Sequence, residues 1–182
     1  MTRTERADAQ RNRKRLLEVA REAFTSGAGK VSLDAIARGA GVGIGTLYRH
    51  FPTREALVEA VYRAERTRVC DSAAELLAQE PPDRALRRWM DGFAAYMATK
   101  REMADALRAL VADGTITSAQ ARDELAAAAR LLLDAGAAAG ALRSDVAPED
   151  LVTGLVGLLF VTTGPEQTTR LLDLLMDALR AT

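Results

Sequence analysis

Residues 32–54, SLDAIARGAGVGIGTLYRHFPTR, decide the fold of the first third of the chain. They contain two short helix-forming segments, over 33–39 and 45–50, which are joined by a glycine-rich turn. Two short helices joined by a tight turn that contains glycine form a helix-turn-helix. Ala37 is small enough to lie where the two helices cross, and Gly41 supplies the positive φ that the turn requires. The stretch therefore predicts a helix-turn-helix.

A longer helix is expected before this motif, over about residues 7 to 25, with Gly27 and Gly29 ending it. It completes a head of three helices. Ser32 is expected to cap the second helix through its hydroxyl, and Thr53 to cap the fourth helix. The apolar residues expected to pack the head together are Leu16, Ala20, Ala23, Phe24, Ile36, Val42 and Leu47.

The rest of the chain shows helical spacing of apolar residues and no alternation long enough for a strand. Further helices are expected over 54–78, around the apolar stripes 86–97 and 103–111, over about 118–139, from Pro148 to about 164, and from Pro165 to the end. We therefore predict an all-α fold of about nine helices. The predicted domains are a helix-turn-helix domain over 1–53 and a second helical domain over 54–182.

The zero net charge of this 182-residue chain hides a basic first third. Residues 1–54 carry 11 Lys and Arg against 5 Asp and Glu, whereas residues 55–182 carry 14 against 20. A basic segment on an acidic remainder is typical of a nucleic-acid-binding head joined to a body that has another task.

The composition excludes several classes of protein. A hydrophobic content of 48% with no net charge excludes disorder. The single cysteine, Cys70, and the single histidine, His50, exclude a disulfide framework and a His/Cys metal cluster. The longest uncharged stretch, 151–165, is too short to cross a bilayer, and no secretory leader opens the chain. We expect a soluble cytoplasmic protein with no membrane contact, no metal and no cofactor.

The pattern Ile36-Ala37-x-x-Ala40-Gly41-Val42-x-x-Gly45-x-Leu47-Tyr48-x-His50-Phe51 resembles the DNA-binding signature of the TetR family, the tetracycline-repressor-like transcriptional regulators. The resemblance runs from about Arg13 to Leu57, and the rest of the chain fits the all-helical plan of that family. Two positions depart from the pattern. Gly43 stands where a Ser or Thr cap is usual, which removes a hydroxyl that could reach phosphate. Arg54 stands where Lys is usual, and the charge is kept.

The third helix is expected to present Ile44, Gly45 and Thr46 to base edges, because a recognition helix meets the major groove with its first residues. The resemblance implies that Tyr48 and His50 donate hydrogen bonds to phosphates, and that Ser32, Arg49 and Arg54 add to this backbone clamp. The full DNA-binding set is Ser32, Gly43, Ile44, Gly45, Thr46, Tyr48, Arg49, His50 and Arg54. The basic residues Arg3, Arg6, Arg11 and Arg13 either reach along the DNA or form a solvated helix start.

The second domain is expected to dimerise the chain and to bind an effector. One helix-turn-helix reads only a few base pairs, whereas two copies on a two-fold axis read a palindrome. The expected dimer interface is Leu151, Leu155, Leu158, Leu159, Leu171, Leu172, Leu175 and Leu179, unless these leucines form the core of a single protomer. The expected ligand pocket, mainly apolar, is Trp89, Met90, Phe93, Met97, Met103 and Leu107, unless these residues form a plain packed core.

These features predict a homodimeric repressor that a small, mainly apolar ligand releases from a palindromic operator in double-stranded DNA. A ligand-dependent activator would use the same head, and a helical protein-interaction module is a further alternative. No cofactor motif and no metal-binding spacing of carboxylates and histidine point to an enzyme.

Overall fold

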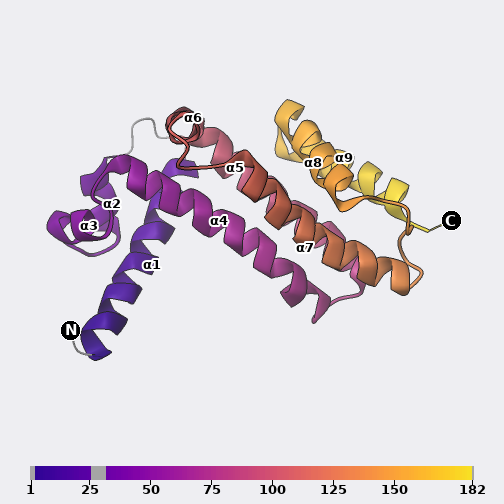
Figure 1. Ribbon diagram of the computed structural model, residues 1–182, viewed down its shortest axis with the longest axis horizontal. Coiled ribbons are helices and arrows are strands. Elements are labelled where there is room, and N and C mark those ends of the chain that lie inside the picture. The colour runs from indigo at the N-terminus through magenta and orange to yellow at the C-terminus, as the bar shows by residue number, and fades with distance from the viewer. Residues whose placement is uncertain (1–2, 26–31, 182) are drawn as a thin grey trace. The chain divides into compact units, whose positions relative to one another are not determined.

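The computed structural model describes residues 3–25 and 32–181. All regular secondary structure in these described residues is helical, and their one β-type pairing is an isolated antiparallel bridge between Leu142 and Arg180. The helices are α1 (Arg3–Thr25), α2 (Leu33–Gly39), α3 (Ile44–His50), α4 (Arg54–Leu77), α5 (Pro82–Glu102), α6 (Ala104–Ala112), α7 (Ser118–Ala138), α8 (Pro148–Val161) and α9 (Pro165–Leu179). The all-α prediction is confirmed (Figure 1).

The described chain separates into two compact units, and both α4 and α5 contribute to each. The first unit takes Met1–Ala64 and Ala98–Ile116, and the second takes Glu65–Met97 and Thr117–Thr182. The first unit thus extends past the helix-turn-helix into the start of α4, and it also holds α6. The division of domains at residues 53 and 54 remains a prediction.

The helix-turn-helix forms in the first unit as its residues require. Gly41 adopts φ 67°, and the amide of Val42 donates a 3.0 Å hydrogen bond to the Ala37 carbonyl across the turn. Ile36 and Leu47 are fully buried, as are Leu16 and Ala20 on α1, and Phe24 on α1 is largely buried. This small apolar core fixes α2 and α3 on α1, so the outer surface of α3 is held on a rigid support. Gly27 and Gly29 lie outside the described residues.

The two predicted helix caps have different outcomes. The hydroxyl of Thr53 accepts a 3.1 Å hydrogen bond from the Ala56 amide at the start of α4, which confirms that cap. Ser32 occupies the cap position of α2 with extended backbone angles, but its hydroxyl makes no capping hydrogen bond. The hydroxyl cap predicted for Ser32 is therefore wrong. Only its backbone carbonyl serves α2, by accepting from the Ile36 amide at 3.2 Å.

Aromatic side chains of α5 form the centre of the second unit. Trp89 is fully buried, and its indole N–H donates a 2.9 Å hydrogen bond to the Val69 carbonyl on α4. The Trp89 and Phe93 ring centroids lie 5.5 Å apart, and the Phe93 and Tyr96 centroids 5.9 Å apart. An ion pair also links α4 to α7, with Nε of the buried Arg66 lying 2.7 Å from Oε2 of the partly exposed Glu124. Together these contacts hold the second part of α4 against α5 and α7.

The carboxyl-terminal residues close on the loop that leaves α7. The Arg143 amide donates to the Leu179 carbonyl at 2.9 Å, and the Ala181 amide donates to the Ala141 carbonyl at 3.2 Å. Leu142 lies buried between these bonds and packs on α7 at Gly136. A Cβ placed at Gly136 would lie 2.3 Å from Leu142 Cδ1, so this helix position has room only for glycine.

Replacing Gly136 by alanine is expected to destabilise the chain. Overpacking a filled core costs about 1–3 kcal/mol, which the greater helix propensity of alanine offsets by at most about 1 kcal/mol. The free energy of unfolding, measured with urea, checks this. Gly92→Ala is the matched control, because a Cβ at this exposed position of α5 meets no atom within 4 Å and should stabilise the helix. A Gly136→Ala variant as stable as Gly92→Ala would contradict the packing.

Candidate nucleic-acid interface

In α3, the helix predicted to enter the major groove, several residues of the predicted DNA-binding set are exposed. Leu47 faces the core of the first unit, whereas Ile44 and Tyr48 remain 36% and 47% exposed, which is high for such large side chains. Gly45 is exposed, and a Cβ at that position would meet no atom within 4 Å. The first turn of α3 thus offers an open surface that carries little bulk.

Arg49 lies along α3 and points back toward its first turn. Its Nε donates to the Gly45 carbonyl at 3.3 Å, and its Nη2 donates to the Thr46 hydroxyl at 3.4 Å. Arg49 therefore shares one surface with Gly45 and Thr46, the residues predicted to approach base edges. The phosphate contact predicted for Arg49 does not explain why its side chain points back along α3.

The residues predicted to contact phosphates surround α3 in the first unit. Ser32 and Tyr48 are exposed, and Gly43 takes the cap position of α3 with no side chain to offer. His50 is half-buried beside Phe51, with ring centroids 6.2 Å apart. The guanidinium carbon of Arg54 lies 5.6 Å from the centre of the Phe24 ring. Stacking on an aromatic ring orients this cation at the start of α4.

The basic residues of α1 divide into two kinds. Arg13 stacks its guanidinium over the Phe51 ring, with the guanidinium carbon 4.8 Å from the ring centre. Arg6 and Arg11 are exposed, and Arg11 pairs with Asp8 one turn earlier. The side chain of Arg3 lies outside the described part of the chain. The ordered position of Arg13 next to α3 favours it as a backbone contact, whereas Arg6 and Arg11 leave both readings of the amino-terminal arm open.

The surroundings of His50 favour its neutral form. Partial burial lowers its pKa below the ordinary 6.5, and the positive charges of Arg13 and Arg49 lower the pKa further. A neutral imidazole still has one N–H to donate. A phosphate placed beside it would raise the pKa again, because a negative charge favours the protonated form.

This pKa shift predicts that DNA affinity depends on pH. If phosphate raises the pKa of His50 in the complex, the complex binds more protons than the free protein, so affinity rises as pH falls between the two pKa values. We expect tighter binding at about pH 6 than at about pH 8. Titrations of His50→Asn should lose this slope, and they are decisive because His50 is the only histidine. An unchanged slope in that variant would remove His50 from the phosphate contacts.

The thiol of Cys70 is unreactive at neutral pH. Burial raises the pKa of its thiol to about 11, with the Glu124 carboxylate adding to the shift. A thiol with this pKa carries almost no thiolate at neutral pH and is a poor nucleophile. In the described residues, no group of three or more His, Cys, Asp and Glu side chains is arranged to hold a metal ion. No helix in that part of the chain is long and apolar enough to span a membrane.

The predicted pocket residues are buried, and the two compact units share them. Trp89, Met90 and Phe93 are fully buried in the second unit, where Met97 is also buried. Met103 and Leu107 are buried in the first unit. The pocket over these six residues therefore remains a prediction.

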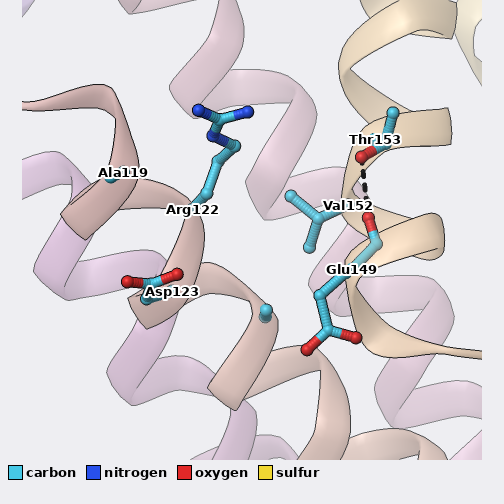
Figure 2. A pocket seen from close by; sticks show the side chains of 7 residues that line it. Ala119, Arg122, Asp123, Glu149, Val152 and Thr153 are labelled. Carbon is cyan, nitrogen blue, oxygen red and sulfur yellow. Dashed lines mark hydrogen bonds between the residues drawn. The ribbon is translucent and has the colours of Figure 1, made fainter.

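A cavity lies elsewhere, between α7 and α8, with a volume of about 280 Å³. Figure 2 shows Arg122 and Asp123 on α7 and Glu149, Val152 and Thr153 on α8 around it. The Thr153 hydroxyl donates to the Glu149 carbonyl at 2.8 Å. This lining is more charged than the predicted apolar pocket, and the sequence analysis missed it because its residues come from two helices with no shared motif.

The leucines predicted for the dimer interface divide between core and surface. Leu151, Leu155, Leu159, Leu172 and Leu179 are buried within their own chain. Leu158, Leu171 and Leu175 are half-buried. The large apolar side chains that α8 and α9 expose are others, namely Val156, Phe160 at 78%, Val161 at 69% and Leu174 at 63%. We call these four residues the α8–α9 apolar surface, which the sequence analysis missed.

Two family models match the chain. Residues 16–61 match the model described as bacterial regulatory proteins, tetR family. Residues 81–181 match the model described as transcriptional regulator SbtR-like, C-terminal domain. The first match contains the helix-turn-helix, and the second contains the five helices from α5 to α9.

Solved structures are similar over nearly the whole chain. A TetR transcriptional regulator from Streptomyces coelicolor is 47% identical with a TM-score of 0.85, over 93% of this chain and 99% of that one. A TetR transcription regulatory protein from Mycobacterium vanbaalenii is 38% identical with a TM-score of 0.78, over 97% and 99%. An HTH-type transcriptional regulator from Staphylococcus aureus (strain USA300) is 43% identical over 53 residues, so the match spans only 29% of that curated relative.

Proposed function

The chain belongs to the TetR family of bacterial transcriptional regulators, and from this premise we propose that it is a homodimeric repressor released from a palindromic operator by a small, mainly apolar ligand. As a member of that family it is a DNA-binding regulator and not an enzyme. The repressor role, the dimer and the ligand are the parts that we propose.

The observation that carries the proposal is the surface of α3. Its first turn is open at Gly45, flanked by Ile44 and Thr46, and rigidly backed by the buried Leu47. A helix held in this way fits the major groove, and donors at its edges set the register on phosphates. We propose that the contacts to phosphates come from Tyr48, His50 and Arg54, together with Ser32 and the Gly43 backbone.

The α8–α9 apolar surface supports a dimer. Monomers rarely leave several large apolar side chains this exposed on two neighbouring helices. Gly154 and Gly157 lie on the same helix α8, and a Cβ at either would meet no atom, so a partner helix can approach closely. We propose that a second copy of the chain covers this surface. Leu158, Leu171 and Leu175 remain in the proposed interface, since each side chain is only partly buried in its own chain.

The proposed effector is a small apolar molecule that inserts among the α5 side chains Trp89, Met90, Phe93 and Met97. These residues are tightly packed, so the ligand must separate them from their neighbours. It can release DNA only by as much as it prefers the separated form. A change from mostly bound to mostly free requires a preference of about 5 kcal/mol.

The test is a fluorescence anisotropy titration of the full chain on DNA from upstream of its own coding region, against scrambled DNA at two salt concentrations. A repressor should prefer the upstream DNA by about a thousandfold or more, and its affinity should fall steeply with salt. Equal weak binding to both DNAs would contradict operator recognition at that site. Addition of candidate apolar ligands to the complex then separates the roles, because a repressor's ligand lowers the anisotropy and an activator's ligand raises it.

A further inference from the structure

We infer that Arg49 is a specificity-determining residue that reads a guanine in each operator half-site, and that Thr46 acts through it as a positioning residue. This inference rests on the proposed function, because it requires α3 to enter the major groove. It replaces the phosphate contact that the sequence predicts for Arg49.

The direction of the Arg49 side chain is the first argument. Both of its hydrogen bonds run back along α3, from Nε to the Gly45 carbonyl at 3.3 Å and from Nη2 to the Thr46 hydroxyl at 3.4 Å. Gly45 has no side chain, and a Cβ there would meet no atom within 4 Å, so the first turn of α3 around the Arg49 side chain is open. The cation therefore lies on the surface of α3 that meets base edges.

The other arginines near α3 supply the contrast. Arg13 is stacked over Phe51, and Arg54 is stacked over Phe24. Both are anchored on rings outside α3, in positions suited to the flanking backbone. Arg49 alone among these three lies along the recognition helix itself, against polar groups of its first turn.

The chemistry of the guanidinium is the third argument. Arginine carries five N–H donors in a planar fork, and the two bonds within α3 leave others to point outward. Guanine presents two acceptors, N7 and O6, in the major groove, and their bidentate pairing with arginine is the commonest specific contact to DNA. The bonds to Gly45 and Thr46 are long and exposed, so they orient the side chain at little cost when it turns to the base.

The experiment selects binding sites for the full-length protein from a randomised double-stranded DNA library. We expect a guanine at one position of each half-site. Replacing that guanine with 7-deazaguanine removes the N7 acceptor and should weaken wild-type binding about 5- to 150-fold, the range of one good bidentate contact. The same replacement should leave the affinity of Arg49→Ala unchanged, because its contact is already absent.

Three further variants distinguish base reading from a phosphate contact. Arg49→Lys keeps the charge and loses the planar fork, so it should weaken the guanine preference and keep most of its affinity for scrambled DNA. Thr46→Val keeps the shape and loses the hydroxyl, so it should weaken the preference at the same position. Arg38→Ala, which removes another exposed arginine of the helix-turn-helix, is the control and should leave the base preference unchanged.

The outcomes separate this inference from the proposed function. If the wild type selects a palindrome but Arg49→Ala and Arg49→Lys keep its base preferences and lose affinity evenly, Arg49 is a phosphate contact and the inference is overturned. A selected palindrome without guanine overturns it as well. If the wild type selects no sequence, the proposed operator recognition fails, and the inference fails with it.

Discussion

Trp89→Ala is expected to lower the free energy of unfolding by about 3–5 kcal/mol, the cost of replacing a large buried aromatic side chain by alanine. Trp89 is fully buried, and it touches Phe93 on its own helix. The same change removes the indole N–H that donates to the Val69 carbonyl, and that carbonyl still accepts from the Ser72 hydroxyl at 2.8 Å. Chemical denaturation followed by circular dichroism measures the loss.

Trp89→Phe separates the two contributions. It keeps most of the aromatic volume and removes the indole N–H, so its loss of stability should be clearly smaller than that of Trp89→Ala. Both variants lack tryptophan, because Trp89 is the only one in the chain, so tryptophan fluorescence can follow the unfolding of the wild type alone. A stability for Trp89→Ala within about 1 kcal/mol of the wild type would contradict its place in the core.

Phe160→Glu is expected to dissociate the proposed dimer and to abolish cooperative operator binding. Phe160 is the most exposed of the large apolar side chains, at 78%, so the substitution should not disturb the protomer. An unpaired carboxylate at the centre of an interface is costly, and central aromatic anchors contribute about 2–4 kcal/mol each. The dimer dissociation constant should therefore rise by at least about thirtyfold. Sedimentation over a concentration series measures it.

Leu131→Glu is the matched control. Leu131 is 45% exposed on α7, and it lies outside the α8–α9 apolar surface. The control should leave the dissociation constant and the operator affinity near those of the wild type. If Phe160→Glu remains dimeric at the same concentrations as this control, another surface forms the dimer.

The helices were predictable because their signals are local. Gly41 marks the turn through its positive φ, Thr53 caps α4 with its own hydroxyl, and Pro148 and Pro165 stand at the first positions of α8 and α9. Each signal depends on one residue and its neighbours in the chain. Ser32 shows the limit of such reasoning, because it occupies the predicted cap position of α2 but its hydroxyl makes no capping hydrogen bond.

The faces of α8 and the direction of Arg49 were not predictable for a different reason. A helix that is apolar all round does not say which side meets its own core, and the leucines predicted for the interface are largely that core. Phe160 and Val156 lie four residues apart on the exposed side, a spacing that could have indicated the second face. The direction of Arg49 is given by its hydrogen bonds to the Gly45 carbonyl and the Thr46 hydroxyl, and the motif does not specify either bond.

The bridge between Leu142 and Arg180 brings together the two ends of the segment that contains α8 and α9, so this segment can be replaced as a block. The segment that contains both helices leaves and rejoins the second unit at neighbouring backbone positions, where Arg143 bonds to Leu179. Segments whose ends lie side by side tolerate replacement as a block. If the proposed dimer forms through the α8–α9 apolar surface, exchanging residues 143–179 for those of a related regulator would transfer that regulator's choice of dimer partner. The residues of α3 proposed to read the operator would be unaltered. Chimeras of this kind would yield regulators that share an operator yet do not mix subunits.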